Sequence, residues 1–171
     1  EGYNLSLRHV TLSTCGLVDK MYALAEKNYQ LTLAVSLHAP NNEIRGQTMP
    51  VNSRYPVETL IQACRDYFGK TGRRITFEYA LIAGVNDSTQ AAQELSQLLK
   101  GLPCHINLIP VNEVKERGMK RSTAQAIQNF QGALKKYGLN ATIRRELGGD
   151  ISAACGQLRR EESMREEEQQ Q

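Results

Sequence analysis

The chain has 171 residues and a net charge of +3, and 40% of its residues are hydrophobic. This length and composition indicate one domain with a hydrophobic core and exclude a chain that is disordered throughout. No run of about 18 apolar residues occurs, so no membrane span is predicted. The N-terminus lacks the basic and apolar regions of a signal peptide. Because it begins with Glu1 rather than Met, we expect a piece of a longer protein.

The cysteines indicate the cellular location, and the acidic C-terminal segment indicates a region without fixed structure. The four cysteines, Cys15, Cys64, Cys104 and Cys155, are widely spaced, and no C-x-x-C pair occurs. This spacing argues against a disulfide framework and predicts a reducing cytoplasmic location. Residues 159–171 are rich in Glu, Arg and Gln and have no apolar face. We therefore expect that segment to be a disordered charged tail.

Strand-like and helix-like segments alternate along the chain. Runs of β-branched and apolar residues predict strands at 10–14, 31–38, 75–82, 105–110 and 141–144. Apolar residues at helical spacing predict four helices between them. Pro56 opens the second helix, Asp87 or Ser88 caps the third, Ser122 caps the fourth and Gly138 ends it. This alternation predicts an α/β fold with parallel strands and right-handed crossovers.

The strand number and the strand ends suggest where a ligand binds. Five strands are too few for a complete eight-stranded barrel, so we expect a partial barrel or a small open sheet. In parallel α/β folds, ligands bind at the carboxyl ends of the strands. Those ends carry polar residues or glycines, namely Ser13, Thr14, Ser36, His38, Gly84, Asn86 and Asn112.

Four short motifs in order resemble the RlmN/Cfr family of radical-SAM RNA methyltransferases, and RlmN-type members most. They are Leu-Ser-Thr at 12–14, Ser-Leu-His-Ala-Pro-Asn at 36–41, Ile-Asn-Leu-Ile-Pro-Val-Asn at 106–112 and Ala-Ala-Cys-Gly-Gln-Leu at 153–158. The resemblance covers roughly residues 8–160. It implies the C-terminal portion of a radical-SAM, TIM-like barrel over residues 1–158, without the first strands, followed by the tail at 159–171.

The resemblance also implies an activity. The family methylates C2 of an adenine in 23S rRNA, and RlmN-type members also act on an adenine in tRNA. One S-adenosylmethionine (SAM) methylates the cysteine that matches Cys155. A second SAM is cleaved at a 4Fe–4S cluster, with electrons from a donor such as flavodoxin, and the resulting radical activates the S-methyl group. Cfr-type members, which act at C8, are not separated from this reading by the motifs.

The resemblance assigns roles to individual residues. Cys155 is the expected catalytic residue, as the S-methylcysteine intermediate. The SAM-binding residues are expected to be Ser13, Ser36, Leu37, His38 and Asn112. The family's cluster loop, C-x-x-x-C-x-x-C, is absent from this chain, so no metal ligands are assigned here. We therefore expect the chain alone to be inactive, and unpaired sheet edges to make it marginally stable or dimeric. Alternatives are a non-catalytic RNA- or nucleotide-binding module and an inert truncated barrel.

Each candidate residue also has a simpler structural interpretation. A lone cysteine such as Cys155 is most often a packing residue. A lone histidine such as His38 is most often hydrogen-bonded within the structure, and the serines can cap strands. Glu78 lies inside a predicted strand, so it is either a paired buried charge or a side chain that points into the barrel. The neighbouring Arg144 and Arg145 either act on Cys155 or RNA phosphate, or are solvated.

Overall fold

The computed structural model describes residues 6–111 and 119–144. Asn112, Cys155 and the predicted tail at 159–171 lie outside the described residues, so the roles expected of them stay predictions. Within the described part of the chain, no helix is both long enough and apolar enough to cross a membrane.

One parallel sheet forms the centre of the fold. Its five strands lie side by side in chain order from β1 to β5, and every neighbouring pair is parallel. The predicted parallel α/β fold is therefore confirmed. The strands are β1 (Thr11–Thr14), β2 (Thr32–Ser36), β3 (Ile75–Leu81), β4 (Cys104–Pro110) and β5 (Ala141–Ile143).

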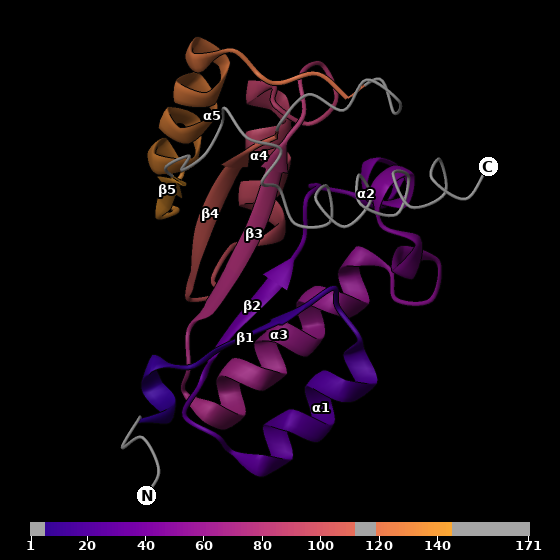
Figure 1. Ribbon diagram of the computed structural model, residues 1–171, viewed down its shortest axis with the longest axis vertical. Helices are drawn as coiled ribbons and strands as arrows, with labels where there is room; N and C mark the ends of the chain where they lie inside the picture. The colour runs from indigo at the N-terminus through magenta and orange to yellow at the C-terminus, as the bar shows by residue number, and fades with distance from the viewer. Residues whose placement is uncertain (1–5, 112–118, 145–171) are drawn as a thin grey trace, which may run out of the picture.

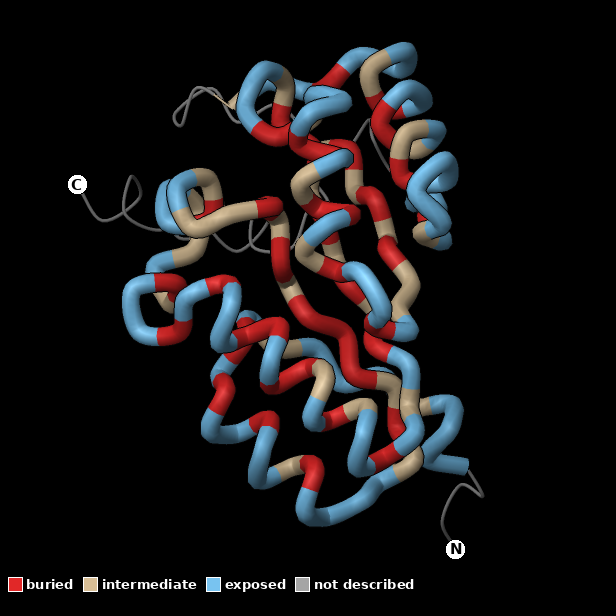
Figure 2. The backbone as a smooth tube through the Cα atoms, turned by 180° about the vertical axis from the view of Figure 1, so that it is seen from behind, coloured by how far each residue is buried: buried red, intermediate tan, exposed pale blue. Residues whose placement is uncertain are grey.

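The helices lie on one face of this sheet. Each strand pairs with the strand before it, and right-handed crossovers in such an order carry every connection along the same face, as in a barrel wall. Figures 1 and 2 show this arrangement from the two sides, with strands in front of α3 and α4 in the first and helices in front in the second. The helices are α1 (Val18–Lys27), α2 (Asn42–Thr48), α3 (Val57–Thr71), α4 (Thr89–Leu98) and α5 (Ala124–Lys136), with two 3₁₀ turns, η1 (Leu7–His9) and η2 (Pro50–Ser53).

Residues of the central strand alternate between the two faces of the sheet. In β3, Ile75, Phe77, Tyr79 and Leu81 are fully buried against the helices. The intervening residues, Glu78 among them, are only half-buried and face the opposite side. We call that side the open face. The buried side chains of the strands and helices form one core, in which the rings of Tyr79 and Phe130 are 5.2 Å apart.

The helix starts follow local hydrogen bonds, with one correction to the sequence prediction. The side chain of Ser88 accepts a hydrogen bond from the amide of Ala91 and caps α4, as predicted. The last helix is capped by Thr123 rather than by Ser122. The prediction was wrong because Ser122 is buried, and its hydroxyl donates to Asp87 at 2.7 Å instead.

Candidate functional site

The carboxyl ends of β1 and β2 bring four of the predicted SAM-binding residues to one edge of the sheet. Ser13 pairs in register with Ala34, and Ser36 follows two residues later, so both serines lie on the open face. Leu37 and His38 continue directly from β2, and both amides donate to the carbonyl of Glu78 in β3. Ser13 is exposed, and Ser36 and His38 are half-buried. We call this carboxyl end of β1 and β2 the rim.

Leu37 supports the rim from within the core. Its side chain is fully buried, its amide donates to the carbonyl of Glu78 at 3.1 Å, and its own carbonyl accepts from the Nε of Arg45 at 3.2 Å. The side chain of Leu37 therefore has no exposed surface, and these two hydrogen bonds hold its backbone between Ser36 and His38.

His38 is held in one orientation and one protonation state. Its backbone is left-handed, with φ of 59°. Its Nδ1 accepts the amide hydrogen of Ala80 at 3.0 Å, so the proton of the neutral ring is on Nε2. Burial, and secondarily the charge of Arg45, lowers the pKa of His38 to about 4. At neutral pH the residue presents an N–H donor, and no described residue accepts it.

Arg45 ties the ends of β1 and β2 together from below. Its side chain is fully buried. Its guanidinium donates to the carbonyls of Cys15 at 2.8 Å, Ser36 at 3.3 Å and Leu37 at 3.2 Å, and to the side chain of Asn52 at 3.1 Å. Burial lowers the pKa of this guanidinium, and none of these partners is a carboxylate. The donors therefore satisfy strand-end carbonyls that would otherwise be buried without partners.

The first rim loop is shaped to receive Arg45. Gly16 has φ of +100°, a conformation that side chains other than glycine rarely adopt. A Cβ atom there would lie 3.0 Å from Leu60 and 3.2 Å from the Nη2 of Arg45. Any larger residue at this position would therefore push the guanidinium away from the carbonyl of Cys15.

Asn86 fastens the end of β3 to the rim. It is 1% exposed, and its Nδ2 donates to the carbonyls of His38 at 2.8 Å and Ala80 at 2.7 Å. Its Oδ1 accepts from the amide of Ile82 at 2.7 Å, and its own carbonyl accepts from the hydroxyl of Tyr79. The sequence marked Asn86 as a rim residue, and the structure shows it holding the backbone of His38 in place.

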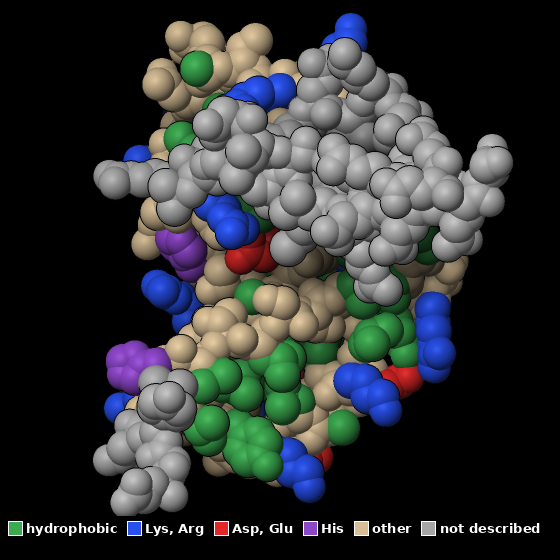
Figure 3. All heavy atoms as spheres, viewed as in Figure 1, with side chains coloured by type: hydrophobic (Ala, Val, Ile, Leu, Met, Phe, Trp, Pro, Cys, Tyr) green, Lys and Arg blue, Asp and Glu red, His purple; other side chains and the backbone are tan. Residues whose placement is uncertain are grey.

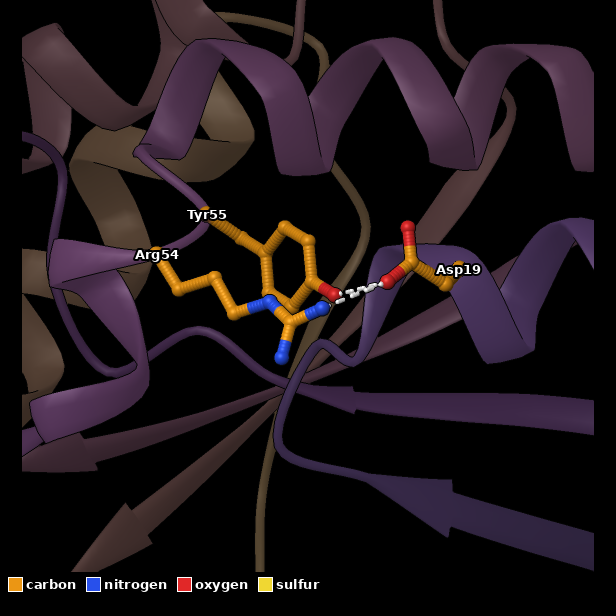
Figure 4. Close-up of polar contacts among 3 residues, drawn as sticks. All are labelled: Asp19, Arg54 and Tyr55. Carbon is orange, nitrogen blue, oxygen red and sulfur yellow. Dashed lines mark hydrogen bonds and ion pairs between the residues drawn. The ribbon is translucent and has the colours of Figure 1, made fainter.

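A second cluster joins α1 to the segment that leads into α3. Asp19 accepts hydrogen bonds from the hydroxyl of Tyr55 and from Arg54, whose Nη2 is 3.0 Å away. The guanidinium of Arg54 also lies 5.1 Å from the centre of the Tyr55 ring. Figure 4 shows the side chains of Arg54 and Tyr55 both directed toward Asp19. The hydrogen bond to Asp19 raises the pKa of Tyr55. This cluster fixes η2, and with it Asn52, which accepts from Arg45.

The sequence prediction missed Arg45, Asn52 and α2 itself. The segment at 42–48 has only Ile44 as a large apolar residue, so it shows no amphipathic stripe. Asn41 caps this helix by accepting a hydrogen bond from the amide of Ile44, and asparagine is one of the preferred N-cap residues. No local pattern indicates that an arginine is buried, because its partners are backbone carbonyls distant in sequence.

The described cysteines do not form a metal centre. Cys15 is exposed after β1, Cys64 is buried in α3, and Cys104 begins β4. Burial raises the pKa of the Cys64 thiol to about 12 and that of Cys104 to about 11. Within residues 6–111 and 119–144, no group of three or more His, Cys, Asp or Glu side chains is placed to hold a metal ion.

Comparison with known proteins shows which proteins the chain is similar to. A protein from Clostridium tetani named as a probable dual-specificity RNA methyltransferase RlmN is 58% identical over 160 residues, which are 94% of this chain and 46% of that protein. A protein of the same name from Lachnoclostridium phytofermentans is 57% identical over 160 residues, 94% of this chain and 45% of the relative. Over 94% of its length the chain is therefore similar to proteins named RlmN. It spans about half the length of these relatives. No protein-family model matches it.

Solved structures support the fold of this chain. The crystal structure of a radical SAM methyltransferase from Sphaerobacter thermophilus has a TM-score of 0.86 and 51% identity, over 90% of this chain and 45% of that one. A domain of a pyruvate-formate lyase-activating enzyme from Bacteroides vulgatus has a TM-score of 0.63 at 20% identity, over 79% of this chain and 80% of that one, and shows the fold alone. The predicted partial radical-SAM barrel is therefore confirmed.

Proposed function

We propose that this chain is the C-terminal portion of a radical-SAM methyltransferase that methylates C2 of adenine in 23S rRNA and in tRNA. The observation that carries the proposal is the similarity to RlmN proteins over 94% of the chain. The rim adds support, because the predicted SAM-binding residues Ser13, Ser36 and His38 converge at the carboxyl ends of β1 and β2. Ligands bind at such strand ends in parallel α/β folds.

The residues of the rim fit one SAM molecule by their hydrogen-bonding character. His38 offers an N–H donor that no described residue uses, and the open face next to it offers the carboxylate of Glu78. SAM carries both acceptors and donors, in its carboxylate, ribose and ammonium groups. Arg45 and Asn86 hold the backbone of the rim, so the donors and acceptors are fixed before a ligand arrives, which lowers the entropic cost of binding.

Cys155 is proposed to carry the methyl group, and it lies outside the described residues together with Asn112. In the complete enzyme, a 4Fe–4S cluster would supply the electron that cleaves SAM. The described cysteines do not fit that cluster, since they lie on different elements and two of them have raised thiol pKa values. We therefore infer that this chain alone does not catalyse methylation, and that its reducing partner and RNA substrates engage the longer protein in the cytoplasm.

The test is genetic complementation with a chemical readout. The full-length protein, its Cys155→Ala variant and the 171-residue chain are expressed in bacteria that lack their own RlmN. Mass spectrometry then measures 2-methyladenosine in 23S rRNA and tRNA. Only the full-length protein with Cys155 should restore the modification. Cys104→Ala is the matched control and should remain active, because Cys104 lies at the start of β4, away from the rim.

Two outcomes would contradict the proposal separately. Restoration by the 171-residue chain would show that the inferred inactivity is wrong. Methylation at C8, or none by the full-length protein, would overturn the assigned reaction.

A further inference from the structure

The central strand of the sheet carries a carboxylate on the face that the helices do not cover. Glu78 is the middle residue of β3, and its neighbours Phe77 and Tyr79 are fully buried on the helix side. Glu78 therefore points toward the open face, which decides between the two alternatives that the sequence left open. Glutamate is unfavourable inside strands, so its presence in the middle of the central strand needs a reason.

Glu78 belongs to a row of polar residues across four strands. The strand register places Ser36 of β2, Glu78 of β3, Asn107 of β4 and Thr142 of β5 side by side on the open face. The Nδ2 of Asn107 donates to both carboxylate oxygens of Glu78, at 3.1 and 3.4 Å. This bond orients the carboxylate and leaves the Oδ1 of Asn107 as a second acceptor beside it.

The row has more acceptors than donors. Within the described residues, the ion pairs are Arg54 with Asp19 and Lys70 with Glu26, so Glu78 is half-buried without a cation. Taking a carboxylate partly out of water without a cation costs free energy. Next to this carboxylate is the Oδ1 of Asn107, which accepts no side-chain hydrogen bond from a described residue. Such a pair of acceptors is suited to a ligand that brings hydrogen-bond donors.

The row lies next to the rim. The backbone carbonyl of Glu78 accepts the amides of Leu37 at 3.1 Å and His38 at 3.3 Å, so Glu78 is one strand away from the SAM-binding residues. The Nδ1 of His38 is bonded to the amide of Ala80, two residues beyond Glu78 and on the same face of β3. A ligand seated at the rim by His38 would therefore extend over the open face toward Glu78 and Asn107.

We propose that Glu78, oriented by Asn107, binds the two ribose hydroxyls of SAM. This inference rests on the proposed function, since it takes SAM as the ligand of the rim. A ribose presents two O–H donors on adjacent carbons, and the Glu78 carboxylate with the Oδ1 of Asn107 presents acceptors on adjacent strands. Carboxylates recognise the ribose of dinucleotides at sheet edges by the same hydrogen bonding. Glu78 is thus a binding residue for the nucleoside half of SAM.

The experiment compares ligand affinities of the full-length protein, reconstituted anaerobically, with those of its Glu78→Gln variant. Calorimetry measures binding of SAM, adenosine, 2′,3′-dideoxyadenosine and L-methionine. Loss of the charged acceptor should weaken SAM and adenosine by about tenfold to a hundredfold, which is the range for a hydrogen bond to a charged group. The affinities of dideoxyadenosine and L-methionine should be unchanged, because neither has the ribose hydroxyls.

Two further variants keep the result interpretable. Glu78→Asp retains the charge and should recover part of the adenosine affinity. Glu26→Gln makes the same chemical change on α1, where Glu26 pairs with Lys70, and should leave every affinity unchanged. Circular dichroism confirms that each variant is folded, and if Glu78→Gln does not fold, Glu78→Asp and its smaller loss decide.

The outcomes separate this inference from the proposed function. If the wild-type protein binds neither SAM nor adenosine, the proposed function itself fails. If the wild type binds both and Glu78→Gln binds them equally well, only the role of Glu78 is wrong. If Glu78→Gln loses affinity only for L-methionine, Glu78 binds the ammonium group. If it loses as much affinity for dideoxyadenosine as for adenosine, Glu78 does not act through the ribose hydroxyls. Either result overturns the inference.

Discussion

At the scale of single residues, His38 makes the stability of the protein depend on pH. Its pKa in the folded protein is about 4, below the ordinary value of 6.5, so folding favours the neutral ring. The resulting stabilisation is complete above pH 6.5 and is lost as the pH falls toward 4. The size of the shift corresponds to at most about 3 kcal/mol.

The prediction is tested with His38→Asn, because asparagine tolerates the left-handed backbone of this position better than most residues. Urea unfolding at a series of pH values should show that the wild type loses more stability than the variant between pH 6.5 and 4. His105→Gln is the comparison variant. His105 is half-buried at the start of β4, and burial lowers its pKa in the same direction as that of His38. Parallel pH profiles for wild type and His38→Asn would refute the assignment.

The same residue illustrates what the sequence predicts and what it leaves open. The position of His38 after a buried strand was sufficient to place it at the rim, because strand ends follow from local patterns. The protonation state of its ring was not predictable, because it depends on the amide of Ala80, 42 residues away. The buried state of Arg45 is set in the same way, by carbonyls of two strands that meet only in the folded sheet.

At the scale of elements, the strands were predictable and one helix was not. The sequence pattern of each of the strands β2, β3 and β4 predicts a strand, because one face of each strand packs in the core and requires apolar residues there. The helix α2 lacks an apolar stripe, and it is held by the Asn41 cap and by the hydrogen bonds of Arg45. Elements stabilised by apolar burial are visible in sequence, whereas an element stabilised by a buried cation is not.

The edge strand β1 is the element that most invites association. Its residues are exposed or half-buried, and Leu12 is 40% exposed. Figure 3, viewed as Figure 1, shows hydrophobic side chains gathered over β1 and α1. The exposed large side chains of this region are Leu7, Leu12, Leu17, Tyr22 and Tyr29. An edge strand with apolar neighbours is a template for pairing with another chain.

We expect the 171-residue chain to dimerise through β1 and Thr11→Pro to abolish the dimer. The amide of Thr32 bonds to the carbonyl of Val10, so in a parallel pair the N–H of Thr11 points away from β2. Proline there removes an outward donor only, and Val10 already has the extended backbone that precedes a proline. Sedimentation equilibrium over a concentration series measures the effect. Thr11→Val, which keeps the N–H, should still dimerise, and a monomeric wild type would contradict the prediction.

At the scale of the whole molecule, the described residues form one wall of parallel strands, and no group of cysteines among them is placed to hold a metal ion. The cysteines illustrate this: Cys15 follows the carboxyl end of β1, whereas Cys104 stands at the amino end of β4, and Cys64 lies within α3 on the helix side. Cluster ligation requires thiolates from a shared site. The raised thiol pKa values of Cys64 and Cys104 oppose ionisation at both. With Cys64 and Cys104 set aside, Cys15 and Cys155 are fewer than the three cysteines that the C-x-x-x-C-x-x-C loop supplies to a 4Fe–4S cluster.

We therefore expect that anaerobic treatment with iron and sulfide loads no stoichiometric 4Fe–4S cluster onto the 171-residue chain. The same treatment of the protein extended upstream to the length of its relatives should load one. Iron and sulfide analysis with electron paramagnetic resonance after reduction measures the content of both. Cys64→Ala in the extended protein should keep its cluster, because Cys64 belongs to the core. A full cluster on the 171-residue chain would show that Cys15 or Cys155 takes part in ligation, and the division between a radical-generating part and a ligand-binding part would be wrong.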